Sequence, residues 1–191
     1  MTITNMKNTL DARSMRGARL LQISHVFGLV SLLIQAPALV ETNFDPYVSK
    51  FQRIIDLARL VLEPQKQEVT DKTFKIEFVL DMQLVAPLYA VAHRCRDPVI
   101  RREAVYLLKH RPWREGLWDS SLAAVTAEKI ISLEEESLVS VTSCHDVPEW
   151  ARIRNVDVEF DVEGRLGKIK YTRRRAEDNG TMEEYVDQMQ W

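Results

Sequence analysis

The fold of this chain is decided by the stretch from Phe78 to Glu136, which reads FVLDMQLVAPLYAVAHRCRDPVIRREAVYLLKHRPWREGLWDSSLAAVTAEKIISLEEE. Two signals for a helix start lie within it, Asp97-Pro98 and Asp119. An aspartate before a helix accepts hydrogen bonds from backbone N–H groups of the first turn, and proline suits the first helical position. Together with apolar residues at helical spacing, these signals predict helices over residues 74–95, 98–111 and 120–136, the first of them kinked or split at Pro87.

Two further helices are predicted upstream. Residues 20–40 are nearly continuously apolar, but they are interrupted by Gln22, Ser24, His25, Gln35 and Pro37, among others. Because polar residues are costly inside a membrane, we expect a buried helix over residues 15–36 rather than a membrane span. The second helix is amphipathic and extends from Asp45-Pro46 to about residue 62, with Asp45 expected to cap its first turn.

The pattern changes toward the C-terminus. Apolar and charged residues alternate from Val156 to Asp161 and again from Lys168 to Tyr171, on either side of the turn DVEGR. This alternation is typical of a β-hairpin, whose apolar face needs to pack on the helices. We therefore predict a mainly α fold, an array of antiparallel helix pairs with a small C-terminal β-hairpin. Its expected segments are a disordered N-terminus over 1–14, a helical domain over 15–140, the hairpin over 147–175 and a flexible acidic tail over 176–191.

Composition limits the classes of function. The 191 residues include 26 basic and 28 acidic side chains, a net charge of −2, and 46% of them are hydrophobic. This is the composition of a soluble globular protein, and the near balance of charge argues against binding of nucleic acid by the whole chain. The two cysteines, Cys95 and Cys144, are too few for a disulfide framework.

Candidate catalytic and ligand-binding residues are scarce. Cys144, His145 and Asp146 are the residue types of a catalytic triad, but triads are assembled from positions separated in sequence, so we interpret these three as a polar loop. The histidines and cysteines lack the paired spacings of zinc sites, and there is no glycine-rich phosphate loop. The sequence therefore predicts no catalytic, cofactor-binding or metal-binding residues, and no enzyme.

The arginines of the quoted stretch form the strongest charged cluster. Arg94, Arg96, Arg101 and Arg102 lie close to the acidic residues Asp97, Glu103 and Glu115. We favour ion pairing with these three acids across a seam between helices, and a binding role for the arginines stays open as the alternative.

Two other features have a structural and a functional interpretation. Trp113 and Trp118 flank Gly116 on a short connection, where large aromatic side chains typically hold two helices together. Arg173, Arg174 and Arg175 are the end of a predicted strand or a weak nuclear-localisation signal.

The run from Leu80 to Ser120 resembles the C-terminal regulatory region of the fungal zinc binuclear cluster transcription factors. The residues that carry this resemblance include Pro87, Tyr89, Cys95, Arg96, Asp97, Pro98, Arg101, Arg102, Arg114, Glu115, Gly116, Trp118 and Asp119. The six-cysteine zinc cluster of that family is absent from this sequence. The resemblance therefore implies a helical regulatory domain of the nucleus that acts in transcription by RNA polymerase II without binding DNA itself.

The binding partners of such a domain are also inferred from the resemblance. The resemblance implies protein partners of the transcription machinery or self-association, no membrane, no cofactor, and a small-molecule effector that the sequence does not identify. One alternative is a helical ligand-binding domain or enzyme with a pocket between the first helix and Tyr89. Another is a membrane-associated protein that uses residues 20–40.

Overall fold

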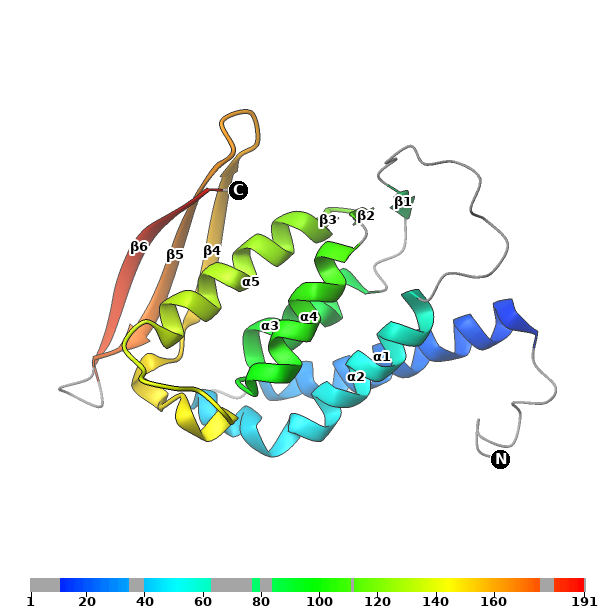
Figure 1. Cartoon of the computed structure of the whole chain (residues 1–191), viewed down its shortest axis with the longest axis horizontal. Coiled ribbons are helices and arrows are strands. Elements are labelled where there is room, and N and C mark those ends of the chain that lie inside the picture. Colours follow the sequence, from blue (N-terminus) through cyan, green and yellow to red (C-terminus); the bar gives the residue numbers. More distant parts are fainter. Residues whose placement is uncertain are drawn as a thin grey trace.

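A computed structural model describes residues 11–34, 40–62, 77–79, 84–110, 112–175 and 181–190. Within these ranges the chain forms a layer of packed helices with a three-stranded sheet at one end (Figure 1). The helices are α1 (Ala12–Ile34), α2 (Val48–Leu62), α3 (Val85–Arg94), α4 (Pro98–His110) and α5 (Ser120–Glu135), with short 3₁₀ helices η2 (Glu41–Tyr47), η3 (Cys144–Asp146) and η4 (Glu149–Ala151).

The first helix starts earlier than predicted. The Oδ1 atom of Asp11 accepts a hydrogen bond of 2.7 Å from the backbone N–H of Ser14, a helix cap that starts α1 at Ala12. The expectation of disorder is therefore wrong for residues 12–14, while residues 1–10 lie outside the described ranges. Ile23 and Val30 of α1 are buried in the helical core. Of the helices that the structure describes, none is sufficiently long and apolar to cross a membrane.

The connection to α2 differs from the prediction in a way that matters for the site. Asp45 lies inside the 3₁₀ helix η2 and does not cap α2. Its two carboxylate oxygens instead accept hydrogen bonds of 2.7 and 2.8 Å from the guanidinium group of Arg152. An aspartate before a proline suits a helix cap, but a bidentate, charge-assisted pair is the stronger interaction.

The third helix is shorter than predicted. It begins at Val85, so Pro87 lies in its first turn, where a missing N–H costs little, and does not kink it. Upstream, Glu77–Val79 form strand β1 and not the start of a helix, and residues 63–76, with the predicted polar loop, lie outside the description. Strand β1 pairs in parallel with β2 (Trp113–Glu115), which pairs with β3 (Trp118–Asp119) across a turn.

Both cap predictions within the quoted stretch are confirmed. The Oδ1 atom of Asp97 accepts hydrogen bonds of 3.1 Å from the backbone N–H groups of Val99 and Ile100 at the start of α4. The Oδ1 atom of Asp119 does the same for α5, at 2.9 and 3.2 Å from the N–H groups of the second and third helical residues.

The C-terminal sheet has three antiparallel strands where the sequence predicted two. They are β4 (Arg154–Asp161), β5 (Leu166–Arg174) and β6 (Met182–Gln190), in that order. The expectation of a flexible tail is therefore wrong for residues 182–190. The ring of Tyr185 stacks on Tyr171 at 5.5 Å, and Met189 is buried with Ile130 and Leu133 of α5. These contacts order the third strand against the helices (Figure 1).

The fold class is mainly α, as predicted. The apolar face of the sheet packs on α5, which confirms the expected contact between the C-terminal strands and the helices. The finer prediction of a regular array of antiparallel helix pairs is not supported by the arrangement of α1 to α5.

Candidate functional site

Two of the motif arginines are completely buried. Arg96 and Arg101 have no exposed surface, and both contact Glu134 near the end of α5. The Nη2 atoms of Arg96 and Arg101 lie 2.7 Å from Oε1 and Oε2 of Glu134, respectively. The carboxylate of Glu134 is thus held between two guanidinium groups, and it also accepts a hydrogen bond of 2.9 Å from the backbone N–H of Ile153.

A second buried carboxylate extends this network. Glu41, at the start of η2, accepts a hydrogen bond of 2.9 Å from Nη1 of Arg96 and pairs with Arg94. The guanidinium group of Arg94 also lies over the ring of Phe44, 5.5 Å from its centroid. The network therefore joins four parts of the chain: η2, the α3–α4 corner, the end of α5 and the segment before the sheet.

The seam between helices was predicted, but its partners were not. Glu103 pairs with Arg59 of α2 at 2.8 Å and Asp97 caps α4. Glu115 accepts hydrogen bonds from backbone groups at the start of α3. The observed partners are 38 and 55 positions from Arg96 along the chain. No local pattern in the sequence points to carboxylates so distant.

Burial and charge act in opposite directions on this network. Burial raises the pKa of Glu134, but the charges of Arg96 and Arg101 outweigh it and bring the pKa to about 2. For Arg101 burial is the stronger effect and lowers the pKa, since Arg101 shares Glu134 with Arg96. Next to them the pKa of His93 lies well below its usual range because of burial and the charges of Arg94 and Arg96. His93 is therefore a neutral core histidine.

A second set of bonds ties the segment before the sheet to η2. Arg152 is buried and, besides its pair with Asp45, donates to the backbone carbonyl oxygens of Val147 and Cys144, both at 2.8 Å. Glu149 accepts hydrogen bonds of 3.0 and 2.9 Å from the N–H groups of the first two residues of η2. The polar groups of Arg152 and Glu149 are therefore bonded within the protein, where they hold the segment before the sheet against η2.

Glu115 has a role that the sequence did not suggest. Its buried carboxylate accepts hydrogen bonds of 2.9 Å from the N–H groups of Leu84 and Val85, at the start of α3, and from Nε1 of Trp113. It thus caps α3 from a distant strand, since a negative charge is favourable at a helix N-terminus. Gly116, which follows it, has φ 57°, a conformation that favours glycine.

The aromatic residues of this region contact α3. The rings of Tyr89 and Trp118 are 5.7 Å apart, and Tyr89 lies equally close to His93. Burial raises the pKa of Tyr89 to about 12, so its hydroxyl group stays protonated. Arg114 pairs with Asp119 across the β2–β3 turn at 2.8 Å.

Most family-motif residues therefore serve architecture. They pack in the core, cap helices or form ion pairs, and this account covers Pro87, Tyr89, Cys95, Arg96, Asp97, Pro98, Arg101, Arg102, Arg114, Glu115, Gly116, Trp118 and Asp119. The structure places Arg96 to Arg102 at the α3–α4 corner and Arg114 to Asp119 beyond the opposite end of α4. Of these residues, Pro98 and Arg102 also line an open surface groove. Burial also raises the pKa of the Cys95 thiol to about 12, which keeps it unreactive.

Cys144, His145 and Asp146 form the 3₁₀ helix η3 and do not act on one another. Cys144 is buried, His145 is 80% exposed, and the carboxylate of Asp146 accepts hydrogen bonds from Thr142 and Ser143. Potential ligand atoms of Asp45, Cys144 and His145 lie within 4.8 Å of one another, the spacing of a metal site. However, the Asp45 carboxylate is already neutralised by Arg152, whose positive charge opposes a cation there. These residues do not fit a metal ion.

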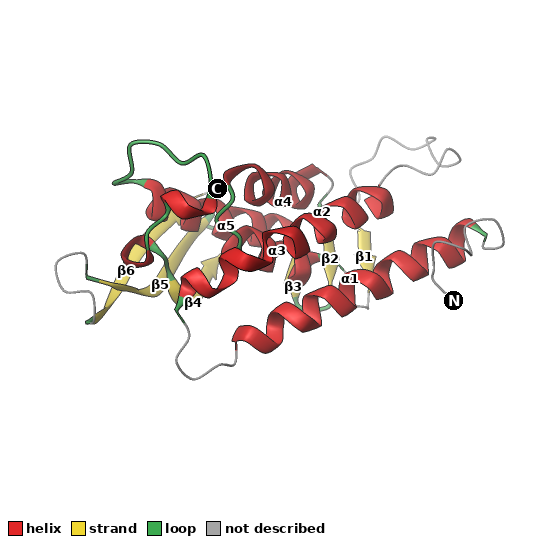
Figure 2. Ribbon diagram, turned by 90° about the horizontal axis from the view of Figure 1, so that it is seen from below, coloured by secondary structure: helices red, strands yellow, loops and turns green. Residues whose placement is uncertain are grey.

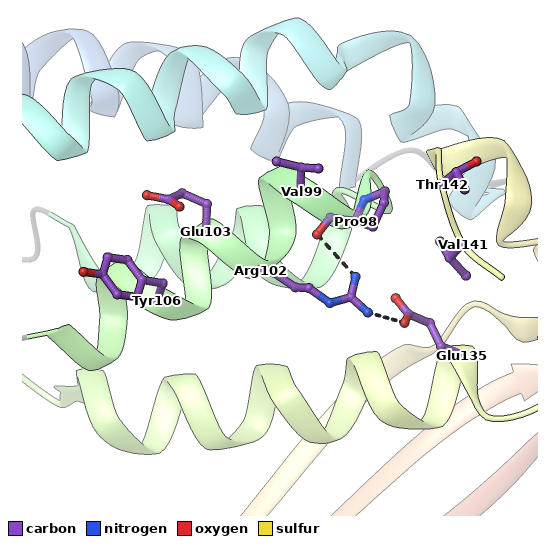
Figure 3. Close-up of a pocket in the computed structure, with 8 residues that line it drawn as sticks. All are labelled: Pro98, Val99, Arg102, Glu103, Tyr106, Glu135, Val141 and Thr142. Carbon is purple, nitrogen blue, oxygen red and sulfur yellow. Dashed lines mark hydrogen bonds and ion pairs between the residues drawn. The ribbon is translucent and has the colours of Figure 1, made fainter.

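The surface has an open groove of about 720 Å³ between α4, α5 and the segment that follows α5 (Figure 3). Arg102 of α4 crosses it to Glu135 of α5 and also donates to the carbonyl oxygen of Pro98. Val99 and Tyr106, 74% and 55% exposed, line the α4 side. This groove lies away from Tyr89, where the alternative of a ligand-binding domain expected a pocket.

Comparisons relate half of this chain to a fungal regulator. Over 100 residues, 50% of the chain, it is 34% identical to the aspercryptin biosynthesis cluster-specific transcription regulator of Emericella nidulans. The matched stretch covers only 16% of the length of that relative. No family model matches the chain, and no solved structure matches it. The chain thus contains a region related to a fungal transcription regulator.

Proposed function

We propose that this chain is a helical regulatory region of the kind found in fungal zinc-cluster transcription factors, which works in the nucleus and acts through protein contacts. The observation that carries the proposal is the similarity to a fungal cluster-specific transcription regulator over half of the chain. The residues of the quoted stretch that carry the resemblance to the zinc-cluster family support the same proposal.

The polar groups of the motif favour a role in binding other proteins over a role in catalysis. A catalytic group needs access to a substrate and a free proton donor or acceptor. In this chain the buried carboxylate of Glu134 is saturated by Arg96, Arg101 and a backbone N–H group, and the thiol of Cys95 is buried. We therefore assign no reaction to the domain, which offers its partners a fixed outer surface.

The chain is not expected to contact DNA by itself. Sequence-specific binding by the zinc-cluster family depends on six cysteines, and this sequence has two, Cys95 and Cys144, both buried. The net charge of −2 provides no general attraction to phosphates. The arginines that looked available in the sequence, Arg96 and Arg101, are paired with carboxylates inside the protein.

A tethering experiment tests the proposal. The whole chain is fused to an unrelated DNA-binding domain and tested on a reporter gene in a fungal cell, with a fluorescent tag to locate it. We expect nuclear fluorescence and a change of reporter output relative to the DNA-binding domain alone. A core variant such as Leu88→Asp, which removes the fold, serves as the control and abolishes the change. An unchanged reporter with a folded, expressed fusion contradicts the proposal.

A further inference from the structure

The first helix exposes a strip of apolar side chains on the side away from the core. Ile23 and Val30 of α1 are buried against the other helices. On the opposite side Leu21, Leu29 and Leu32 are 73%, 47% and 66% exposed. Helix α1 lies along one edge of the helical layer (Figure 2). On this face Leu21, Ser24, His25, Gly28 and Leu32 are exposed and Gly17 is partly exposed. We call Gly17, Leu21, Ser24, His25, Gly28 and Leu32 the outer strip of α1.

The part of α1 that carries most of the outer strip has no charged side chains, and there is open space above its glycines. Residues 20–34 contain no aspartate, glutamate, lysine or arginine, which is unusual for a helix face in water. A side-chain carbon placed on Gly17 or Gly28 would meet nothing within 4 Å, so there is open space above both glycines. The strip thus presents two exposed leucines among small and uncharged residues, and exposed apolar side chains grouped on one face can mark a site of interaction.

The order of large and small residues on the strip is self-complementary. Consider two copies of α1 that run antiparallel, with a two-fold axis between Ser24 and His25. Leu21 of each copy then lies opposite Gly28 of the other, and Leu32 lies opposite Gly17. Each leucine therefore meets a glycine, where the absence of a side chain leaves room for it. A two-fold axis requires this property, because the same surface of both copies must fit itself.

Charge favours the same antiparallel arrangement. The N-terminal part of α1 carries Arg13, Arg16 and Arg19, and its last turn contains no basic residue. The C-terminal end of a helix has a partial negative charge from its free carbonyl groups. In the antiparallel pair, Arg13 and Arg16 of one copy lie beside that end of the other copy. A parallel pair would instead bring the arginines of the two copies together.

We propose that two copies of this chain associate through the outer strips of their α1 helices, antiparallel, with Leu21 of each packed on Gly28 of the other. The occupant of the strip is therefore a second copy of the chain. The strip lies on a different helix from the buried ionic network and from the α4–α5 groove. The pairing does not depend on the proposed role in transcription.

The molar mass of the purified full chain in solution tests the association. Light scattering or sedimentation is expected to give a dimer for the wild type. Leu21→Glu is expected to weaken dimerisation by about 100-fold or more, because the symmetry places the buried charge in the interface twice. Leu117→Glu is the matched control, since Leu117 is a fully exposed leucine on the β2–β3 turn. It is expected to leave the dimer unchanged.

A charge-rescue variant tests the antiparallel register. In Leu21→Glu with Gly28→Lys, the antiparallel pairing places each new glutamate opposite a new lysine, so the double variant is expected to recover dimerisation that Leu21→Glu loses. A parallel pairing gives no such recovery. Circular dichroism verifies that each variant keeps its helices, which is expected because neither side chain is buried.

Cysteine crosslinking provides a second measure of the geometry. Ser24→Cys lies beside the two-fold axis and is expected to form a disulfide between copies under mild oxidation. Leu21→Cys lies seven residues from its symmetric partner, about 10 Å along the helix, and is not expected to crosslink. The native cysteines are buried and give little background. A monomeric wild type, a dimer that Leu21→Glu leaves unchanged, or efficient crosslinking of Leu21→Cys overturns the proposal. Association only with a different protein overturns it as well.

Discussion

The Oε1 atom of Glu134 lies 2.7 Å from Nη2 of Arg96, and neither side chain is exposed to solvent. The two residues are 38 positions apart, so this ion pair joins the α3–α4 corner to the end of α5. Moving two charges out of water is costly, and the pair is stable only because further hydrogen bonds and charges satisfy both groups. Arg101, Glu41 and the backbone of Ile153 supply them.

Glu134→Gln is expected to destabilise the protein by about 3–5 kcal/mol, since two guanidinium groups would lose their shared negative charge inside the core. The free energy of unfolding in urea measures this loss. Glu128→Gln on the same helix is the control, because Glu128 forms an exposed pair with Lys109 and is expected to cost less than about 1 kcal/mol. Equal losses in the two variants contradict a structural role for the buried pair.

Much of this arrangement is local in sequence and was predictable, and the rest is not. Asp97 and Asp119 cap helices that begin next to them, so the sequence predicted both starts correctly. The partners of Arg96 are distant along the chain, and only the packing of four segments brings Glu41 and Glu134 to it. Local rules failed for them because such rules describe neighbours.

Two other differences have the same physical origin. Asp45 has the sequence context of a helix cap, but a buried arginine competes for its carboxylate and wins. Strand β6 turns only two apolar side chains, Tyr185 and Met189, toward α5. The remaining residues of this strand are mostly polar, so the sequence resembles a solvated tail.

His93→Phe is expected to remove part of the loss of stability in weak acid. The pKa of His93 is lowered in the folded state, so below about pH 6.5 the unfolded chain binds a proton that the folded protein excludes. The wild type therefore loses stability as the pH falls from 6.5, by up to about 2 kcal/mol at pH 5. Urea titrations at pH 7.5 and 5 are expected to show a smaller difference for the variant.

The control for this titration is His110→Phe, because His110 is exposed at the end of α4. It is expected to keep the pH dependence of the wild type. A His93→Phe variant with the full pH dependence would show that His93 is not the group responsible.

Stability should fall again in stronger acid because of Glu134. Its folded-state pKa of about 2 lies below the ordinary value of 4.5, so its contribution is complete above pH 4.5 and is lost as the pH falls toward 2. The difference corresponds to roughly 3 kcal/mol for one carboxylate. Thermal unfolding between pH 5 and pH 2.5 measures it, and Glu134→Gln is expected to have a flatter profile in this range.

Glu115→Gln is expected to cost about 1–3 kcal/mol, because the buried carboxylate that caps α3 loses its charge and its hydrogen bonds become weaker. The intrinsic fluorescence of Trp113, whose Nε1 donates to the same carboxylate, is expected to change as well. Glu103→Gln, which affects the exposed pair with Arg59, is the control. A variant with wild-type stability would contradict the capping role.

Tyr185→Ser is expected to destabilise the C-terminal sheet by about 2 kcal/mol through loss of the stack with Tyr171 and of buried apolar area. Val186→Ser, on the outer face of the same strand, is the control, since Val186 is 55% exposed. Hydrogen exchange of the β6 amides resolves the effect. Equally fast exchange of these amides in the wild type and both variants would contradict an ordered third strand.

A double-mutant cycle between Arg96 and Glu134 tests most directly whether the motif arginines hold the helices together or serve as a ligand site. The free energies of unfolding are measured for Arg96→Met, Glu134→Gln and the double variant. We predict a coupling of about 2 kcal/mol or more, with the double variant less damaged than the sum of the single ones, because each single change strands a buried charge. Additivity within about 0.5 kcal/mol would contradict the structural account of the motif.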